Sequence, residues 1–452
     1  MKLPWLLLFA ALAAPLAACG DKKTEDKASK SDDDDDDDDD DKGKKGKGKG
    51  KGKGDGKGKG SGDPATSSAE TPSAPLPEVP PAPTEAPKPP MTADQYAAFL
   101  KDKGAPLTPE AYETALLMLA ACKVESSGID YRCQEQKDYN EANSHKASDY
   151  KSHGKIAIKH LRHPAPAVRY KAVFQASLEA FSFNGTPENA TKFFDAARSE
   201  KDPAVLSQFL SHMTNGAKKN ADIRNFALAS VDHSESRVRE AALRVVSDRE
   251  VYASAPTAFE KIVSKAESDP DKTTRATACA GLGETDDPKA VAPIQKILED
   301  NATPDEVRGG CFEGLTKTWT GFPYPKNPSK DGHDLTMKYL TATPRTDKMP
   351  PYRGISSLGW SRTEFKSFDK SGADWFAKVK GFYDKAKLVK ALESVVMDKD
   401  ANQSTRSSSI YALRQLGEQA LLGTLVAGLK KEGGYAGKSL SETAERESKQ
   451  KD

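Results

Sequence analysis

The chain has 452 residues, with 68 basic and 67 acidic side chains and a formal net charge of +1. A charge so nearly balanced lacks the basic excess of a phosphate-binding surface and argues against a nucleic-acid partner. The length is ample for a large buried core.

Residues 1–18 have the features of a secretory signal peptide. Lys2 is their one charged residue, a mostly apolar run extends from Leu3 to Leu12, and small residues lead to Leu16-Ala17-Ala18-Cys19. The apolar run is too short to cross a bilayer as a stable helix, whereas its length and its small-residue end suit a cleaved signal. An ordinary signal peptide that contains Cys19 by chance is the alternative.

The Leu-Ala-Ala-Cys sequence resembles the lipobox of bacterial lipoproteins. This resemblance implies that Cys19 is lipidated and becomes the first mature residue, with the covalent lipid as the only attached group. Each buried methylene of the acyl chains adds about 0.8 kcal/mol to membrane binding. By the same resemblance the protein is lipid-anchored in the bacterial cell envelope. Gly20 stands where retained lipoproteins of related systems often carry Asp, which favours the outer membrane over the inner membrane.

Residues 19–90 form a low-complexity tether. They contain an acidic run (Asp32 to Asp41), a Lys-Gly block (Lys42 to Gly60) and a Pro-rich block (Pro64 to Pro90). So few apolar side chains cannot offset the entropy of ordering, and we expect a disordered spacer. Loose calcium binding by the acidic run and contact of the Lys-Gly block with an anionic polymer are the alternatives.

Helix signals begin at Met91 and predict an all-α body. Thr92 with Gln95 has the pattern of a capping box, and Thr108-Pro109-Glu110 places a capping residue before a proline. Thr303-Pro304-Asp305 has the same pattern. We expect residues 91–149 to form an N-terminal helical cap region.

Two features of this first part of the body carry candidate chemistry. Cys122 and Cys133 bracket a short loop, and an exported protein can keep a disulfide there, worth about 3 kcal/mol in the loop-entropy model. His153, His160 and His163, with His145 nearby, are weak candidates for metal ligands, because their spacing matches no familiar zinc pattern. We therefore expect no metal centre.

A Val-Arg pair or a variant of it recurs along the body. Its arginine positions are 169, 239, 275, 308, 353 and 406, with Leu206 filling the gap after the first. Neighbouring positions are 33 to 37 residues apart up to Arg308, and then 45 and 53 residues apart. A period in the thirties indicates stacked helix pairs, none of which can bury its apolar face alone.

These residues resemble HEAT-type repeats, best between Asp269-Pro270 and Asp300. The resemblance covers roughly 150–433 and implies a HEAT-like α-solenoid of stacked helix pairs behind the disordered tether. Small residues such as Ala276, Ala278 and Gly281 would let neighbouring helices approach closely. We expect the recurring arginine to tie a turn carbonyl or an Asp to the adjacent repeat, with an anion-binding ladder as the alternative.

Cys279 and Cys311 fall at like positions of consecutive repeats. Because helix axes lie roughly 8–10 Å apart and a disulfide needs Cα atoms within about 7 Å, we favour two buried thiols, although a bond stays open.

Aromatic residues crowd into an insert at about 319–383, where the repeat spacing stretches. Insertions in a solenoid gather on one face, often the binding face. The candidates for partner binding are Trp319, Tyr324, Tyr352, Trp360 and Trp375. The alternative, which we favour, is that these aromatics fill an irregular part of the core.

The sequence therefore predicts a non-enzymatic, lipid-anchored scaffold that binds an envelope protein. A polysaccharide-binding or cell-wall-modifying protein, with Asp369 and Asp374 as candidate acids, is the alternative from another class. A metal-binding lipoprotein is a weaker one. The polar residues 434–452 are expected to be a frayed helix or tail.

Overall fold

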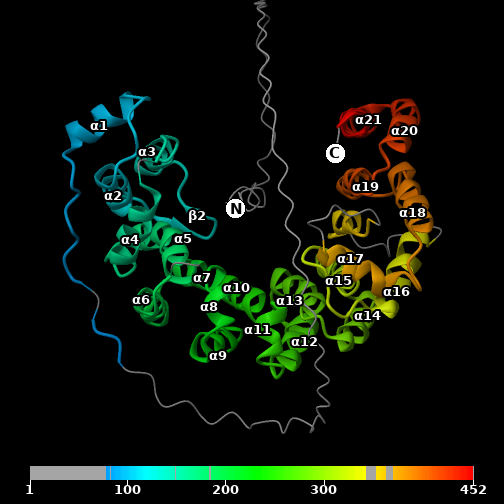
Figure 1. Ribbon diagram of the computed structural model, residues 1–452, viewed down its shortest axis with the longest axis horizontal. Coiled ribbons are helices and arrows are strands. Elements are labelled where there is room, and N and C mark those ends of the chain that lie inside the picture. Colours follow the sequence, from blue (N-terminus) through cyan, green and yellow to red (C-terminus); the bar gives the residue numbers. More distant parts are fainter. Residues whose placement is uncertain are drawn as a thin grey trace, which may run out of the picture. The chain divides into compact units, whose positions relative to one another are not determined.

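A computed structural model describes residues 78–81, 83–147, 149–182, 185–342, 353–362 and 370–450. The signal peptide, Cys19, residues 19–77 of the tether, Tyr352 and Asp369 lie outside the described residues. Within them the fold is all-α, as expected, with one two-stranded hairpin. Figure 1 shows helices following one another as packed pairs.

The N-terminal cap region, residues 91–149, contains three helices, one 3-10 turn and the hairpin. Its elements are α1 (Ala93–Lys101), α2 (Pro109–Met118), η1 (Leu119–Ala121), β1 (Val124–Glu125), β2 (Gly128–Ile129) and α3 (Gln134–Ala142). Helix α4 (Tyr150–His160) follows it and begins the repeat region. The capping box of Thr92 and Gln95 is confirmed, and the Thr108 side chain accepts the Ala111 amide. Both contacts satisfy helix N–H groups that have no partner within the helix.

One helix of each repeat packs against its counterpart in the next repeat. These first helices are α5 (Pro166–Phe181), α7 (Pro203–Ser211), α10 (Ser236–Ser247), α13 (Lys272–Glu284) and α15 (Asp305–Lys317). The corresponding helix α19 (Gln403–Gln415) and α15 both contact the 3-10 turn η3 (Ile355–Trp360). Helix α15 begins one residue later than Thr303-Pro304 suggests, with Pro304 itself as the N-cap.

A second layer of helices covers one side of the first. It comprises α6 (Pro187–Ser199), α8 (Thr214–Ala217), α9 (Ala221–Ser230), α11 (Arg249–Ala253), α12 (Ala258–Ser268), η2 (Pro288–Ala290), α14 (Val291–Glu299), α16 (Lys330–Thr341), α18 (Lys385–Met397) and α20 (Gln419–Glu432). Both layers contribute to one buried apolar cluster that extends from Tyr96 to Ala444.

The aromatic insert and the C-terminus add three further elements, η3 (Ile355–Trp360), α17 (Lys370–Val379) and α21 (Gly434–Lys449). Helix α21 corrects the expectation of a frayed tail, because it packs along α20 and against α19. Leu440 and Ala444 recur at helical spacing and are buried, which explains why so polar a segment is held.

The closest helix contact joins α13 and α15, and small residues make it. A Cβ atom on Gly310 would lie 2.3 Å from the carbonyl oxygen of Ala276, and one on Gly314 would lie 2.2 Å from that of Cys279. Only glycine permits backbones to approach so closely. The expectation that small residues let neighbouring helices approach closely is therefore confirmed between α13 and α15.

No helix in the described part of the chain is both long and apolar enough to span a membrane.

Candidate functional site

Most of the aromatic side chains that the structure describes in the insert are buried in the core or packed against it. Trp319 and Trp375 are 0% and 1% exposed, which rules out direct contact of either side chain with a partner in this structure. The Trp375 indole Nε1 donates to the Trp319 carbonyl oxygen at 2.5 Å, and the Trp319 Nε1 donates to Thr336 Oγ1 at 3.1 Å. Both buried N–H groups are satisfied, so these two candidates for partner binding serve packing instead.

Tyr324 is also buried, at 7% exposure. Its ring stacks on Trp375 with centroids 5.2 Å apart, and its hydroxyl donates to the Trp360 carbonyl oxygen at 2.9 Å. Arg249 of α11 holds the same loop by donating from Nη2 to the Pro323 carbonyl oxygen at 2.8 Å. The loop is thereby fixed to the second layer of an earlier repeat.

Phe322 and Trp360 form an aromatic pair that reaches solvent. Phe322 is 56% exposed, Trp360 is half-buried, and their ring centroids are 5.1 Å apart. The Arg362 guanidinium lies 5.9 Å from the centroid of the Trp360 ring. Of the five expected binding residues, Trp360 is the one whose described side chain reaches solvent. Phe322 was missed, because sequence alone does not distinguish an exposed aromatic from a buried one.

The candidate metal histidines are buried and engaged elsewhere. His160 Nε2 lies 2.7 Å from Glu113 Oε1, His163 Nδ1 accepts the Ala165 amide at 3.0 Å, and His153 stacks on Tyr112. Burial lowers the pKa of His153. Burial, and then the charge of His160, lowers the pKa of His163. Within the described ranges, the histidines do not join any group of three close metal-ligating atoms.

The group of close ligand atoms that does occur consists of Cys122, Cys133 and Glu135. Its two cysteines form the expected disulfide, with Cα atoms 5.8 Å apart. Oxidation removes the thiolates that a metal would need. The Glu135 carboxylate lies 3.0 Å from Cys133 Sγ as a contact, since a disulfide sulfur carries no hydrogen to donate.

Cys279 and Cys311 also form a disulfide, which corrects our preference for two free thiols. Their Cα atoms are 4.7 Å apart. The reason is the glycine contact between α13 and α15, which brings these helices closer than the usual axial spacing on which that preference rested.

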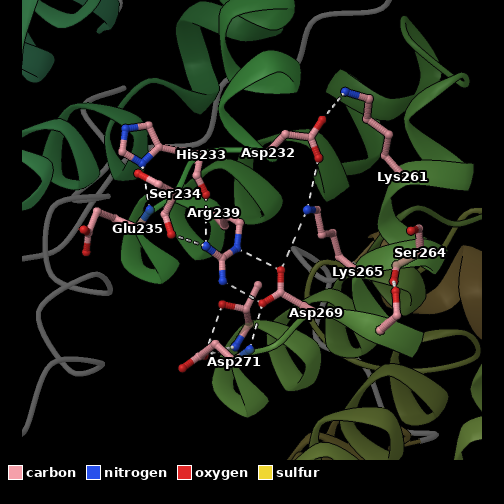
Figure 2. A network of polar contacts seen from close by, with 12 residues as sticks. Asp232, His233, Ser234, Glu235, Arg239, Lys261, Ser264, Lys265, Asp269 and Asp271 are labelled. Atoms are coloured by element: carbon pink, nitrogen blue, oxygen red, sulfur yellow. Dashed lines mark hydrogen bonds and ion pairs between the residues drawn. The ribbon is translucent and has the colours of Figure 1, made fainter.

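The recurring arginine joins repeats, as expected. Arg239, the fourth residue of α10, donates from Nη1 to the carbonyl oxygens of His233 and Ser234 in the turn before its own helix, at 2.9 and 2.7 Å. Its Nε and Nη2 donate to the two carboxylate oxygens of Asp269 at 2.8 and 2.7 Å. Figure 2 shows this contact and the turn around Asp271. We use the word clamp for an arginine that bonds a carbonyl oxygen before its own helix and both carboxylate oxygens of an acidic residue before the next repeat.

The clamp recurs at two other repeats. Arg169, the fourth residue of α5, bonds the carbonyl oxygens of His163 and Pro164 and both carboxylate oxygens of Glu200. Arg406, the fourth residue of α19, bonds the Val396 carbonyl oxygen and both oxygens of Glu432. The bond to Arg406 lowers the pKa of Glu432. Because protein groups satisfy these guanidinium groups, the clamps do not support the anion-ladder alternative.

The acidic partners of the clamps were missed by sequence reasoning. Glu200 and Asp269 could have been recognised by their position in a turn just before a helix. The residue three positions before each of α5, α7, α10 and α13 accepts the amide two residues further on through its side chain. These turn residues are His163, Glu200, His233 and Asp269. The arginine of one repeat therefore forms an ion pair with the turn that precedes the first helix of the next repeat.

Two cavities lie between the second-layer helices α6 and α9. One, of about 500 Å³, is lined by residues that include Phe181, Phe194 and Ile223. The other, of about 330 Å³, is lined by residues that include Leu206, Phe226 and His233. Arg198 borders both cavities and is paired with Asp195 at 2.9 Å.

Comparison of the chain with protein-family models and with curated proteins finds no match.

Proposed function

We propose that this protein is a non-enzymatic scaffold of the bacterial cell envelope, anchored by lipid on Cys19 and presenting a HEAT-like solenoid to a protein partner. The observation that carries the proposal is the repeated clamp. Buried polar side chains of the solenoid, such as Arg239, Asp269 and Arg406, are devoted to joining repeats. The exposed surface is then the part of the solenoid that can bind a partner, as in other stacked-repeat architectures.

Two disulfides in the body support the cellular location. Disulfides persist in oxidising compartments outside the cytoplasm, which fits the signal peptide and lipobox of the N-terminus. Replacement of Cys19 by alanine should abolish incorporation of labelled palmitate and release the protein from the membrane fraction. Palmitate labelling that survives in the Cys19→Ala variant would contradict the anchor.

The surface that we propose for the partner is the Phe322–Trp360 pair. Partly exposed aromatic rings held by fixed backbone suit the anchor residues that dominate protein interfaces. Tyr324 and Arg249 hold the loop, so Phe322 would meet a partner without reordering its backbone.

A photoreactive residue at position 322 tests this surface in cells. We expect it to crosslink one envelope protein, and a photoreactive residue at Tyr435, which is 79% exposed on α21, to give no such product. Crosslinks to glycan at position 322 would favour polysaccharide binding, because aromatic rings also stack on sugars. Equal products at both positions would refute a specific surface here.

A further inference from the structure

Three side chains at the base of the hairpin bring metal-ligating atoms together. One atom each of Cys122, Cys133 and Glu135 lies within 4.8 Å of the other two. Glu135 Oε2 lies 3.0 Å from Cys133 Sγ and 3.9 Å from Cys122 Sγ. Two sulfur atoms and one carboxylate oxygen are ligands that Zn²⁺ accepts. In the oxidised protein, the disulfide removes the two thiolates that such an ion would need.

The Glu135 carboxylate has a position that the disulfide does not explain. Glu135 is half-buried in the first turn of α3, where the helix dipole favours an acid. The dipole does not account for a carboxylate oxygen in contact with a sulfur atom, which has no hydrogen to donate. Among the contacts of the described residues, this carboxylate has no basic side chain as a partner. A cation held by the two sulfur atoms would pair with it directly.

The two disulfides of the body differ in their access to an external thiol. Cys279 and Cys311 are both 0% exposed. Cys133 is half-buried, and Tyr131 just before it is 77% exposed. Exchange begins when an external thiolate attacks a disulfide sulfur, and exposed disulfides are the labile ones. The Cys122–Cys133 bond is therefore the one that a small dithiol can reach in the folded protein.

Opening this bond leaves a geometry that suits zinc. An external dithiol gives two electrons and two protons to the sulfur atoms, so that it becomes a disulfide and each cysteine becomes a thiol. Zn²⁺ then displaces both thiol protons. Thiolates on a tetrahedral Zn²⁺, at about 2.3 Å from the ion, lie about 3.8 Å apart. The Cα atoms of Cys122 and Cys133 are 5.8 Å apart, so rotation of the two side chains accommodates this separation.

We propose that Cys122, Cys133 and Glu135 form a redox-gated site for a soft divalent cation, with Zn²⁺ as the ion of best fit. The cation enters after an external dithiol has opened the disulfide, and a water molecule completes its coordination. This inference does not depend on the lipid anchor or on the identity of a partner.

The site closes the loop that contains the hairpin. Strands β1 and β2 pack on α5, and the Glu125 carbonyl oxygen accepts a hydrogen bond from Arg237 Nη1 of α10 at 3.4 Å. A disulfide and a bound Zn²⁺ join the same two cysteines, so either one holds the hairpin in place on these helices. Reduction without a metal removes the link between Cys122 and Cys133 and should loosen the hairpin.

Cobalt binding to the full-length protein tests the site, because Co²⁺ takes the ligands of Zn²⁺ and its bonds to thiolates give a charge-transfer absorption. After reduction with dithiothreitol and removal of the reductant without oxygen, we expect one Co²⁺ per chain, displaced by Zn²⁺. The oxidised protein should lack the absorption. Absence of the absorption from reduced protein, in which alkylation detects the thiols of Cys122 and Cys133, would overturn the proposal. So would its survival in the double variant Cys122→Ser with Cys133→Ser.

Replacement of Glu135 by glutamine tests the carboxylate. A neutral amide is a poor ligand, so the Co²⁺ affinity of the reduced protein should fall at least about tenfold. Glu141→Gln, on the same helix, is the matched control, because the Glu141 carboxylate pairs with Lys103 instead. That variant should keep the affinity of the parent. Equal affinities in Glu135→Gln and the parent would overturn the assignment of Glu135 as a ligand.

Trypsin cleavage after Arg132 tests the site without any substitution. Arg132 is exposed next to Cys133. We expect the reduced, metal-free protein to be cut there severalfold faster than the reduced protein with Zn²⁺, because the ion closes the loop. Cleavage after Lys219, which is exposed outside the hairpin, should be equal in the two forms. Equal rates at Arg132 would overturn the proposal, whether or not the variants fold.

Discussion

Arg239 and Asp269, thirty residues apart, form a bidentate ion pair in which both side chains are almost completely buried. Each member needs the other, because removing one leaves an uncompensated charge away from water. The same arginine also bonds two carbonyl oxygens of its own repeat. One side chain therefore fixes the entry of its own helix and its distance to the next repeat.

Replacement of Asp269 by asparagine should lower the free energy of unfolding by about 3 kcal/mol, since it strands the Arg239 guanidinium. Urea unfolding monitored by circular dichroism measures this loss. Glu188→Gln is the control, because Glu188 pairs with Lys192 at an exposed site away from the clamp and such pairs contribute about 0–1 kcal/mol. Similar losses in the two variants would contradict the role of the clamp.

The arginines could be recognised from sequence, and their acidic partners could not. The Val-Arg period marks Arg169, Arg239 and Arg406, because a repeated residue stands out against a variable background. Glu200 and Asp269 are single acids in a chain rich in acids. Only the register of the turn, three residues before each helix, singles them out.

Burial explains what else could not be predicted. The sequence around a tryptophan near a helix end, such as Trp319, is the same whether its side chain is exposed to a partner or buried against Thr336. The Cys279–Cys311 pairing depended on a helix separation that Gly310 and Gly314 set, and only the structure places those two glycines directly against the backbone of α13.

All four body cysteines should resist alkylation when the purified protein is denatured without a reductant. Mass spectrometry of the alkylated protein measures this directly. Replacing both Cys279 and Cys311 by alanine should lower the free energy of unfolding by roughly 3–4 kcal/mol, because their bond closes a loop of 32 residues. Alkylation of Cys279 or Cys311 before reduction would contradict the bond, and the Cys122–Cys133 pair serves as the internal control.

Stability should fall between pH 7 and pH 5. The folded pKa values of His153 and His163 lie below the ordinary value of 6.5, so the unfolded chain binds protons more readily than the folded one. The stabilisation is complete above about pH 6.5 and is lost as the pH falls below it. Thermal unfolding at several pH values measures the trend.

The control for this trend is His163→Asn, whose amide oxygen can still accept the Ala165 amide but does not titrate. Its melting temperature should fall less between pH 7 and pH 5 than that of the unmodified protein. An identical fall in both would show that His163 does not contribute.

Replacement of Gly314 by alanine should destabilise the fold by about 1–3 kcal/mol, the usual effect of overpacking. Its Cβ would lie 2.2 Å from the Cys279 carbonyl oxygen, so α13 and α15 would have to separate at the point where the disulfide holds them together. Gly423→Ala is the matched control, because Gly423 lies within α20 and a Cβ there meets nothing within 4 Å. That variant should be more stable by about 0.5–1 kcal/mol, since alanine favours helix over glycine. Chemical denaturation of the two variants side by side measures both effects, and a Gly314→Ala protein as stable as the parent would show that the α13–α15 contact is looser than the glycines imply.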